Sequence, residues 1–416
     1  MTGIKQVLLD PAIQIGADLT KWLSLGGGDG LKAAIANPAG ALDTVRDSGL
    51  RGMGGAGFPT SRKWEMLIEN QAHDKAIVCN GNEDEPGTFK DRHLLEHTPH
   101  QVIEGGLIAA VATGTNQLFF YINPHHTKGL AAMRRAVEQW LVHDLLQQAQ
   151  AAIGKSIKLS VVESSGLYIG GEETAVISTI EGGFPFPRRK PPFPAQSGVF
   201  GAPTVINNVE TLANLPHILS HGAAWHRANG IGDAVGTKLY SLSGDVLRPG
   251  LYELPMGSSL HDLVFVHGMG MLSGKEFKAV FTGGPSNTLL TKKDLDVALD
   301  FDSVRARNSR LGTGAMIVIS EGTSIVRKIS EYMDFFANGS CGQCPPCKSG
   351  TYQLSRILNR IDAGDGAEGD LAALENLCRI LPGCGRCALI DGAVTVVESS
   401  LSTFRNEYVS SIRRRD

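Results

Sequence analysis

The distribution of cysteines constrains this chain more than any other feature of its sequence. Six of the seven cysteines lie between Cys341 and Cys387, whereas the rest of the 416-residue chain contains only Cys79. A disulfide-rich secreted domain would be short and cysteine-dense throughout. One cluster in a long chain instead favours a metal or iron–sulfur site. Cys79 ends an apolar run and is predicted to be a buried, unligated thiol.

The spacing inside this cluster suits two kinds of metal site. Cys341-x2-Cys344-x2-Cys347 can place three thiolates around one corner of a cubane iron–sulfur cluster, each on a different iron. A fourth ligand must then come from one of three later cysteines, which are Cys378, Cys384 and Cys387. Cys344-x2-Cys347 can also pair with Cys384-x2-Cys387, and two such motifs suit structural Zn²⁺. The spacing favours the iron–sulfur cluster and leaves structural zinc and unligated thiols as the alternatives.

The overall composition argues against several classes of protein. Lys and Arg number 39 and Asp and Glu 42, so the formal net charge is −3, and the chain lacks the basic field that binds nucleic acid or an anionic membrane surface. No stretch approaches the ~20 apolar residues of a membrane helix. The first residues lack the basic and apolar regions of a signal peptide. We therefore expect a soluble, cytoplasmic protein with no membrane span.

The pattern of apolar residues divides the chain into three predicted units. Residues 1–235 comprise a polar leader followed by alternating strand-like and helix-like segments, which predict an α/β domain with a largely parallel sheet. Residues 236–320 carry short strand-like runs between Gly and Pro turns and predict a small β-rich module. Residues 321–416 have apolar positions at helical spacing and predict a small helix bundle that holds the cysteines.

Within the first unit, the expected elements alternate along the chain. The expected strands are Ala76–Cys79, Leu118–Ile122 and Ile157–Val162. The expected helices are Ser61–Asn70, Asp91–Val111, Thr127–Ala149 and Glu172–Ile180. The proline-rich run 184–194 can be neither helix nor central strand and is predicted to be extended.

A glycine-rich turn is the first candidate for a nucleotide site. Gly52-x-Gly54-x-x-Gly57, with Gly55 in the same run, precedes a predicted helix, and the backbone N–H groups of such a turn can bind a phosphate. The preceding segment looks helical rather than extended, so a tight structural turn is the alternative. Lys63 lies on the first turn of the helix, where it could neutralise a phosphate or remain solvated.

Acidic and amide side chains supply further candidates. Asn80, Asn82, Glu83 and Glu85 directly follow a predicted strand, which is where α/β sheets bind ligands. Carboxylates there can accept hydrogen bonds from ribose hydroxyls, and an acidic solvated turn is the alternative. Two later segments supply the remaining candidates, which are Tyr168, Gly171, Glu172, Glu173, Asn207, Asn208 and Thr211. The amides among them suit the edge of a heterocycle.

Seven motifs occur in series along the chain. They are RGMGGAGFPTSRKW, CNGNEDEPGTFKDR, YIGGEETA, KPPFPAQSG, PTVINNVETL, SGDVLRPGLYELP and SCGQCPPCKSGTY with a later CAL. In this order the sequence resembles the NADH-binding flavoprotein subunit of respiratory complex I and its relatives in NAD-linked hydrogenases, formate dehydrogenases and aldehyde oxidoreductases. The resemblance covers about residues 45–410. It implies a Rossmann-like flavin/NADH domain, a small β-grasp (ubiquitin-like) domain and a C-terminal four-helix bundle that carries an iron–sulfur cluster.

The resemblance also implies roles for residues at matching positions. Flavin contacts would come from Gly52, Gly54, Lys63, Asn80, Gly171, Asn207, Asn208 and Thr211. NADH would lie among Glu85, Tyr168, Glu173 and Lys190, with Phe58 and Phe193 stacking on its adenine. One [4Fe-4S] cluster would be held by Cys341, Cys344, Cys347 and Cys387, because Cys387-Ala-Leu matches the family's final motif. FMN is the implied flavin, and FAD is the alternative.

Two positions depart from the family pattern. Asn82 stands where the family usually has Asp, and Met66 stands where many relatives have an aromatic residue. The resemblance implies hydride exchange between nicotinamide and flavin, followed by one-electron steps through the cluster. No protein acid or base is required for hydride transfer, so no catalytic residue is expected. Electrons are expected to pass to or from another redox subunit. The alternative is a non-catalytic scaffold held by zinc, with an empty nucleotide-like cleft.

Overall fold

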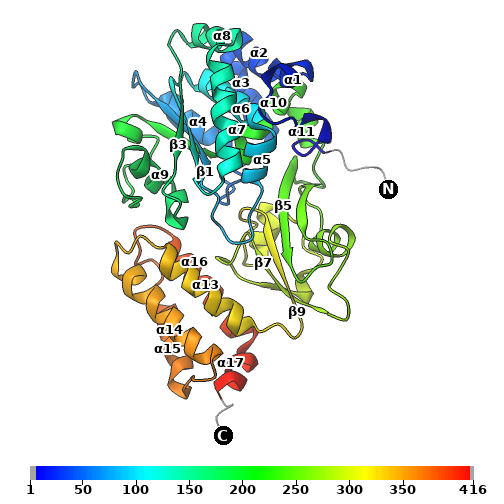
Figure 1. Cartoon of the computed structure of the whole chain (residues 1–416), viewed down its shortest axis with the longest axis vertical. Helices are drawn as coiled ribbons and strands as arrows, with labels where there is room; N and C mark the ends of the chain where they lie inside the picture. The colour runs from blue at the N-terminus through cyan, green and yellow to red at the C-terminus, as the bar shows by residue number, and fades with distance from the viewer. Residues whose placement is uncertain (1–5, 413–416) are drawn as a thin grey trace.

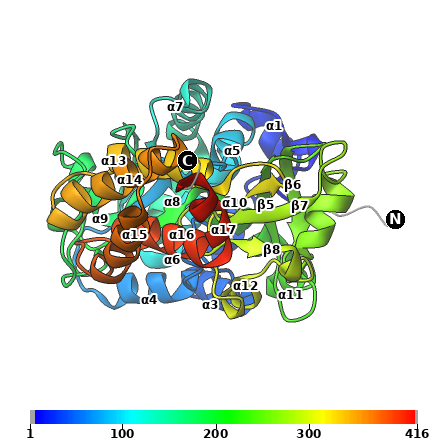
Figure 2. The ribbon, with the colours of Figure 1, turned by 90° about the horizontal axis from the view of Figure 1, so that it is seen from below.

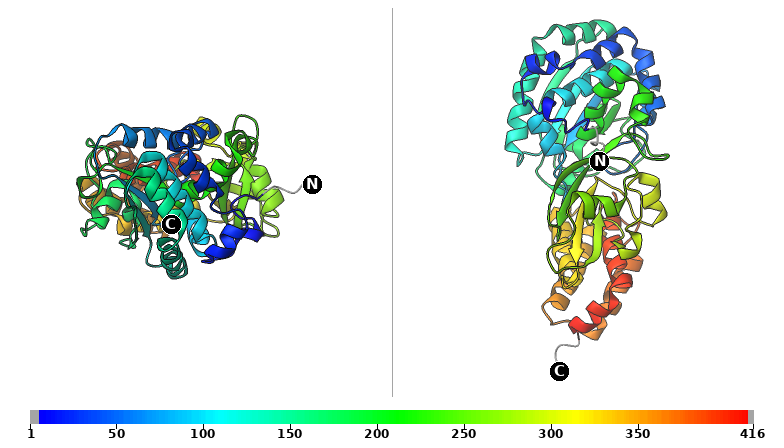
Figure 3. Two further views of the ribbon diagram at one scale, coloured as in Figure 1. Left: turned by 90° about the horizontal axis from the view of Figure 1, so that it is seen from above. Right: turned by 90° about the vertical axis from the view of Figure 1, so that its right-hand side faces the viewer.

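The computed structural model describes residues 6–412, and its three regions follow one another along the long axis of the molecule (Figure 1). Residues 1–5 and 413–416, at the ends of the first and third predicted units, lie outside the described range. A helix-covered sheet forms one end, a second sheet follows, and the C-terminal helices form the other end, as the side view also shows (Figure 3).

The first region is built on a parallel sheet with the strand order β3-β2-β1-β4. Its strands are β1 (Ala76–Gly81), β2 (Gln117–Ile122), β3 (Lys158–Glu163) and β4 (Thr204–Asn208). The prediction of an α/β region with a parallel sheet is confirmed. Strand β4 is missing from the predicted elements, although its Thr-Val-Ile run is β-branched and buried. The register pairs Asn80 of β1 with Asn208 of β4, so two amides meet at the carboxyl edge of the sheet.

Both faces of this sheet are buried. Ile77 and Cys79 of β1 belong to the main core, whereas Val78 packs on the opposite face with Val176 and Ile177. Such alternation follows from the two-residue period of a strand. The helices of this region are α4 (Thr60–Glu69), α5 (Asp91–His97), α6 (Pro99–Thr113), α7 (Thr127–Leu141), α8 (Asp144–Ile153), α9 (Glu173–Ile180), α10 (Val209–His221) and α11 (Ala223–Arg227).

Two of the long predicted helices are each broken in two. The helix expected over 91–111 ends at His97, and α6 starts at Pro99 because proline lacks an N–H but suits the first helical turn. The helix expected over 127–149 ends at Leu141. There the His143 side chain accepts a hydrogen bond from the Leu145 N–H group and caps the new helix α8.

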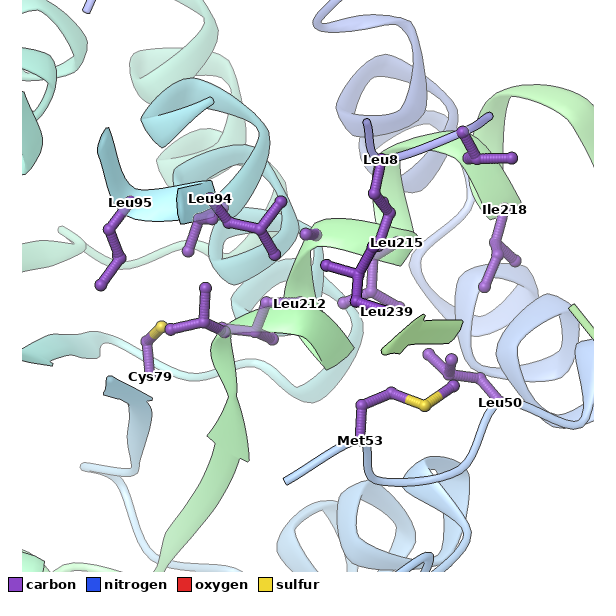
Figure 4. Close-up of a cluster of buried hydrophobic side chains, with 14 of the residues drawn as sticks. Leu8, Leu50, Met53, Cys79, Leu94, Leu95, Leu212, Leu215, Ile218 and Leu239 are labelled. Atoms are coloured by element: carbon purple, nitrogen blue, oxygen red, sulfur yellow. The ribbon is translucent and has the colours of Figure 1, made fainter. Parts of the chain in front are cut away.

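The segment predicted as a polar leader packs onto the first region. It contains α1 (Leu19–Ser24), α2 (Asp29–Ala36) and α3 (Pro38–Ser48). Trp22 is buried, and its Nε1 donates to the Glu104 carboxylate of α6 at 2.8 Å. Leu8 lies in the same buried cluster as Leu215 of α10, and Met53 and Leu239 approach this cluster from two other segments (Figure 4).

The second region is a mixed sheet with the order β6-β5-β9-β7-β8. Its elements are β5 (Thr237–Gly244), β6 (Gly250–Pro255), β7 (Phe277–Thr282), β8 (Leu290–Thr291), α12 (Phe301–Ala306) and β9 (Ala315–Ser320). The central pair β5 and β9 is parallel, and the other pairs are antiparallel. The strand-like runs predicted in this region are therefore strands in the structure.

The third region is helical, as predicted. Its helices are α13 (Ile325–Gly339), α14 (Tyr352–Asp362), α15 (Glu368–Ile380), α16 (Leu389–Thr403) and α17 (Arg405–Ile412). They lie together at one end of the molecule (Figure 1) and in front of the first region in the view from below (Figure 2). Buried apolar residues such as Phe336 of α13, Leu358 of α14 and Val397 of α16 form their common core. Among the helices that the structure describes, none has the length and apolar character to cross a membrane.

Candidate functional site

A cavity of about 340 Å³ opens at the carboxyl edge of the parallel sheet. Ligands bind at this edge in open α/β sheets. The predicted site residues that line it are Gly54, Asn80, Asn82, Glu83, Glu85, Tyr168, Gly171, Glu172, Asn208 and Cys387. The cavity is therefore bounded by the first region on one side and by a residue of the cysteine cluster on the other.

A second cavity, of about 210 Å³, adjoins the first and shares Gly54, Asn80, Gly171 and Asn208 with it. Its other predicted residues are Gly52, Gly55, Phe58, Lys63, Glu173 and Asn207. Together the two cavities form one elongated site that runs from the glycine turn to the cysteine region. An elongated site suits a flavin or a dinucleotide better than a compact ligand.

The glycine turn is held by its own backbone and by α10. The Gly52 N–H donates to the Phe58 carbonyl at 2.8 Å, and the Gly57 N–H donates to the Gly52 carbonyl at 3.2 Å. The Thr211 hydroxyl accepts from the Met53 N–H at 2.9 Å, so Thr211 supports the turn from behind. A Cβ atom at Gly54 would lie 2.9 Å from the Cβ of Asn208, which explains why glycine stands there.

The start of α4 offers unpaired donors to the smaller cavity. No side chain caps this helix, and the Thr60 hydroxyl is buried without a hydrogen-bond partner in the described chain. Thr60 lines the cavity together with Lys63. A helix N-terminus with a free hydroxyl and a nearby lysine fits an anionic group such as a phosphate. Thr60 is absent from the predicted site residues, although it is the first residue of the helix after the glycine run.

Lys63 is not freely solvated. Its Nζ donates to the Ile206 carbonyl at 3.2 Å and lies 4.0 Å from the Glu173 carboxylate. Burial lowers the pKa of Lys63, and the charge of Glu173 opposes that shift. Glu173 also forms an ion pair with Lys190. Lys63, Glu173 and Lys190 therefore form a row of alternating charges beside the smaller cavity.

Two side chains of the acidic loop after β1, Asn82 and Glu83, anchor the loop to the rest of the first region. The Glu83 carboxylate accepts from the backbone N–H of Asp91 at 2.7 Å and from Nε of Arg92 at 2.7 Å, so it stabilises the start of α5. The Asn82 amide donates to the Leu167 carbonyl at 3.0 Å and accepts from the Ser164 hydroxyl. Both side chains hold the loop in place. The Glu83 carboxylate is therefore already occupied by protein donors.

Other predicted residues have similar supporting contacts. Asn80 donates to the Gly171 carbonyl at 2.9 Å. The Glu172 carboxylate accepts from the N–H groups of Thr174 and Ala175 and caps α9.

Phe58 and Phe193 expose 41% and 52% of their surface, so both are accessible to a stacking ring.

Glu85 places a carboxyl group in the wall of the larger cavity, where two hydroxyl groups contact it. Its carboxylate accepts from the Tyr168 hydroxyl at 2.7 Å and from the Ser286 hydroxyl at 3.2 Å. Burial raises the pKa of Glu85 to about 7, against the effect of these two hydrogen bonds. Ser286, which comes from the second region, is a cavity residue that no sequence motif had indicated.

The structure brings Cys387 to the three cysteines of the loop. Cys341, Cys344 and Cys347 lie between α13 and α14, and Cys387 lies just before α16. Burial, reinforced by the charges of the other three thiols, raises the pKa of Cys347. Burial raises the pKa of Cys387 to about 11, and Cys341 and Cys344 contribute to that shift. The thiols of Cys341, Cys344, Cys347 and Cys387 are therefore near enough to influence one another electrostatically.

The other two cysteines of the cluster lie apart from this group. Cys384 is exposed, and its thiol donates to the Ile380 carbonyl at 3.4 Å. Cys378 is buried, and burial with the charges of Glu398 and Glu375 raises its pKa to about 12. These contacts do not support either thiol as the fourth ligand.

The arrangement favours a cluster over a single ion. Among residues 6–412, no three His, Cys, Asp or Glu side chains converge closely enough for one metal ion. A zinc site requires sulfurs at about 2.3 Å from a common centre. A cubane binds each cysteine through a separate iron and therefore spaces its ligands more widely. Four thiols that influence one another without a common centre are compatible with a cluster.

Tyr168 joins the cavity to the cysteine region. Its hydroxyl bonds to Glu85, while its ring meets Phe335 and Phe336 of α13 edge-on at 4.8 and 5.7 Å between centroids. Helix α13 leads directly into the cysteine loop. The fold and the site together define a protein that places a flavin or nicotinamide cavity next to an iron–sulfur centre.

Comparisons with known proteins identify the family. Residues 45–217 match the model of the Nuo51 FMN-binding domain, and residues 327–411 match that of the NADH-ubiquinone oxidoreductase-F iron-sulfur binding region. The chain belongs to this family of flavin- and iron–sulfur-binding NADH-quinone oxidoreductase chains.

Similar chains extend over nearly the whole sequence. The F 2 chain of the NADH-quinone oxidoreductase from Rhizobium meliloti is 42% identical over 94% of this chain and 93% of its own length. The HndC chain of the NADP-reducing hydrogenase from Solidesulfovibrio fructosivorans is 40% identical over 94% of this chain and 80% of its own. A solved structure of an NAD⁺-reducing [NiFe]-hydrogenase in the H₂-reduced state superposes with a TM-score of 0.85 and 34% identity. That match covers 97% of this chain and 68% of the hydrogenase chain.

Proposed function

We propose that the chain exchanges electrons between NAD(H) and a partner redox subunit through FMN and one [4Fe-4S] cluster. The observation that carries this proposal is the wall shared by the two sites. Cys387, Ala388 and Leu389 line the same cavity as Asn80 and Glu85. A ring bound in that cavity is therefore separated from the cluster by little more than its ligand. FAD is the alternative flavin, to be excluded by analysis of the released cofactor.

Residues of this chain would bind and orient the cofactors. Bound FMN accepts hydride and releases single electrons, which is the chemistry that the protein groups themselves lack. The glycine turn, Thr60 and Lys63 would hold its phosphate. Asn80 and Asn208 line both cavities. Hydride transfer needs no protein base, so the side chains act by positioning and by excluding water.

The nicotinamide nucleotide would occupy the outer part of the site. Glu85 and Tyr168 present a hydrogen-bonded pair to the cavity, and the ion pair of Lys190 with Glu173 stands at the smaller cavity. Phe58 and Phe193 expose ring surface that could stack on adenine. The rest of the proposed cofactor set is Gly52, Gly54, Gly55, Gly57, Asn82, Glu83, Gly171, Glu172, Asn207 and Thr211.

The finer architecture follows from the same assignment. We propose a domain division at 1–235, 236–320 and 321–416. The strand order β6-β5-β9-β7-β8, with a parallel central pair, supports a β-grasp domain. Helices α13, α14, α15 and α16 around one core support a four-helix bundle. We also propose that the protein works in the cytoplasm, with partner subunits that carry iron–sulfur or other metal cofactors.

Analysis of the purified protein tests the proposal. It should be yellow-brown, release about one FMN and contain about four irons per chain, and it should reduce an artificial dye with NADH. Co-purification followed by analysis for nickel, molybdenum and tungsten would identify the class of partner. Colourless protein with stoichiometric zinc, inactive with NADH, would instead establish the scaffold alternative.

A further inference from the structure

A buried network of four charged groups lies between the first and second regions. The side chains of Lys90, Glu210 and Lys238 are fully buried, and that of Asp91 is 5% exposed. Nζ of Lys90 lies 2.7 Å from the Asp91 carboxylate and 2.9 Å from that of Glu210. Nζ of Lys238, on β5, lies 3.2 Å from the same Glu210 oxygen. The two positive and two negative groups balance.

The network reaches both walls of the proposed flavin site. Nζ of Lys238 donates to the Met53 carbonyl at 3.3 Å, inside the glycine turn. On the other wall, Lys90 donates to the side-chain amide oxygen of Asn208 at 2.9 Å, and the amide nitrogen of Asn208 donates to Asp91 at 2.6 Å. Asn208 is the residue that a Cβ at Gly54 would contact. The network thus holds two facing segments of the site from behind.

The second region also touches the turn through its backbone. Gly55 forms a β-bridge with Gly312, and the hydroxyls of Thr88 and Thr313 are 2.8 Å apart. The Leu239 N–H donates to the Glu210 carboxylate at 2.8 Å, which fixes β5 against α10. These contacts make the second region part of the site's rear wall, not merely a spacer before the cysteine region.

Stability alone does not explain such a network. Buried ion pairs are expensive to desolvate, and well-packed apolar residues often replace them without loss. Here the charged groups end on Asn208, which lines both cavities, and on the backbone carbonyl of Met53, which lies between the cavity residues Gly52 and Gly54. A network in this position fixes the glycine turn and Asn208 relative to each other.

We propose that Lys238 is a positioning residue for flavin binding: from the second region it holds the glycine turn at its distance from Asn208. This inference rests on the proposed function, because it requires FMN in the cavity. Lys238 does not contact the cavity itself and acts through the Met53 carbonyl and through Glu210. No motif in the glycine turn could have revealed a support that comes from a strand 185 residues later.

Titration of FMN into flavin-free protein tests the proposal through quenching of flavin fluorescence. Lys238→Met should weaken FMN binding about tenfold or more, because a buried hydrogen bond from a charged donor is lost. Lys238→Arg keeps the charge and donors and should recover most of the affinity. The electron paramagnetic resonance signal of the reduced cluster should be unchanged in both, since Nζ of Lys238 bonds to Met53 and Glu210 of the first region.

Lys278→Met is the matched control. The Lys278 side chain is also largely buried, lies on β7 of the same sheet, and pairs with Glu407 at 2.7 Å and the Thr323 carbonyl at 2.8 Å, away from the flavin site. The substitution should lower the thermal stability without changing FMN affinity. Equal loss of FMN affinity in both variants, or unchanged affinity in Lys238→Met, would overturn the proposal.

A charge-balanced variant guards against loss of folding. If Lys238→Met does not fold, Lys238→Met with Glu210→Gln removes one charge of each sign and leaves the Lys90–Asp91 pair intact. It should fold, as judged by the cluster signal, and still bind FMN weakly, because the Met53 carbonyl lacks its donor. Normal FMN binding by this variant contradicts the positioning role. Failure of the wild-type protein to bind FMN would refute the proposed function instead.

Discussion

The flavin cavity and the cysteine loop differ in what satisfies their polar groups. Around the cavity, protein groups satisfy one another: Asn208 bonds to Lys90 and Asp91, and Asn80 bonds to Gly171. In the cysteine region, burial and the charges of neighbouring thiols raise the pKa of Cys347 and of Cys387. The cavity is therefore held in shape by the chain, whereas the cysteine region would need the positive charge of iron to hold its thiols in the thiolate form. The two sites should respond differently when their ligands are removed.

The largest effect is expected from loss of a cluster ligand. Cys344→Ser should abolish stable cluster binding, so that iron falls from about four per chain to near zero, while FMN stays bound. Iron, sulfide and flavin analyses of the same sample measure this. Cys384→Ser is the control, because Cys384 is exposed and outside the group of four. Four irons in Cys344→Ser would refute the ligand assignment.

Removal of whole cofactors should separate the two sites clearly. Without the cluster, amides of residues 340–351 should exchange hydrogen about a hundredfold faster, because the iron–sulfur bonds that would tie Cys341, Cys344 and Cys347 to Cys387 are lost. Without FMN, amides of β1 and β4 should change little, since their contacts come from the chain. Hydrogen exchange read by mass spectrometry measures both. Equal protection of the loop with and without the cluster would contradict the proposed dependence of the loop on its ligand.

A smaller effect is expected at the outer rim of the cavity. Glu173→Ala removes the partner of Lys190 and one neighbour of Lys63, and it should raise the KM for NADH about tenfold with little change in flavin content. Glu181→Ala is a suitable control, because Glu181 follows the same helix and pairs with Arg188 instead. Steady-state kinetics with an artificial acceptor measure the effect. An unchanged KM would place Glu173 outside the nucleotide site.

The smallest effect is expected from pH. The pKa of Glu85 is raised to about 7, so its carboxyl is neutral below that pH and charged above it. A nucleotide that fills the cavity desolvates Glu85 further, and binding is then coupled to proton uptake. NADH affinity should fall a few-fold between about pH 6 and 8. Glu85→Gln should flatten this dependence, whereas a persisting slope would point to Asp84, whose pKa burial raises to about 6.

The sequence contained much of the fold and part of the site. Strands β1 to β3 were predictable from apolar runs, and the break at Pro99 could have been read from the proline itself. Spacing alone left three candidates for the fourth cysteine, because it says nothing of how α14 and α15 return the chain to Cys387. The pairing of Asn80 with Asn208 depends on sheet register. The contact of Lys238 with Met53 depends on how two regions dock.

The bridge between Gly55 and Gly312 has a mechanical consequence. It joins main chain to main chain, so no flexible side chain can stretch to absorb a movement between the two segments. Gly283 lies against Gly312 so closely that a Cβ on either would come within 2.6 Å of the other's Cα. Rotating the second region outward would therefore drag the glycine turn with it. A hinge at that junction would have to break this bridge and separate Gly283 from Gly312.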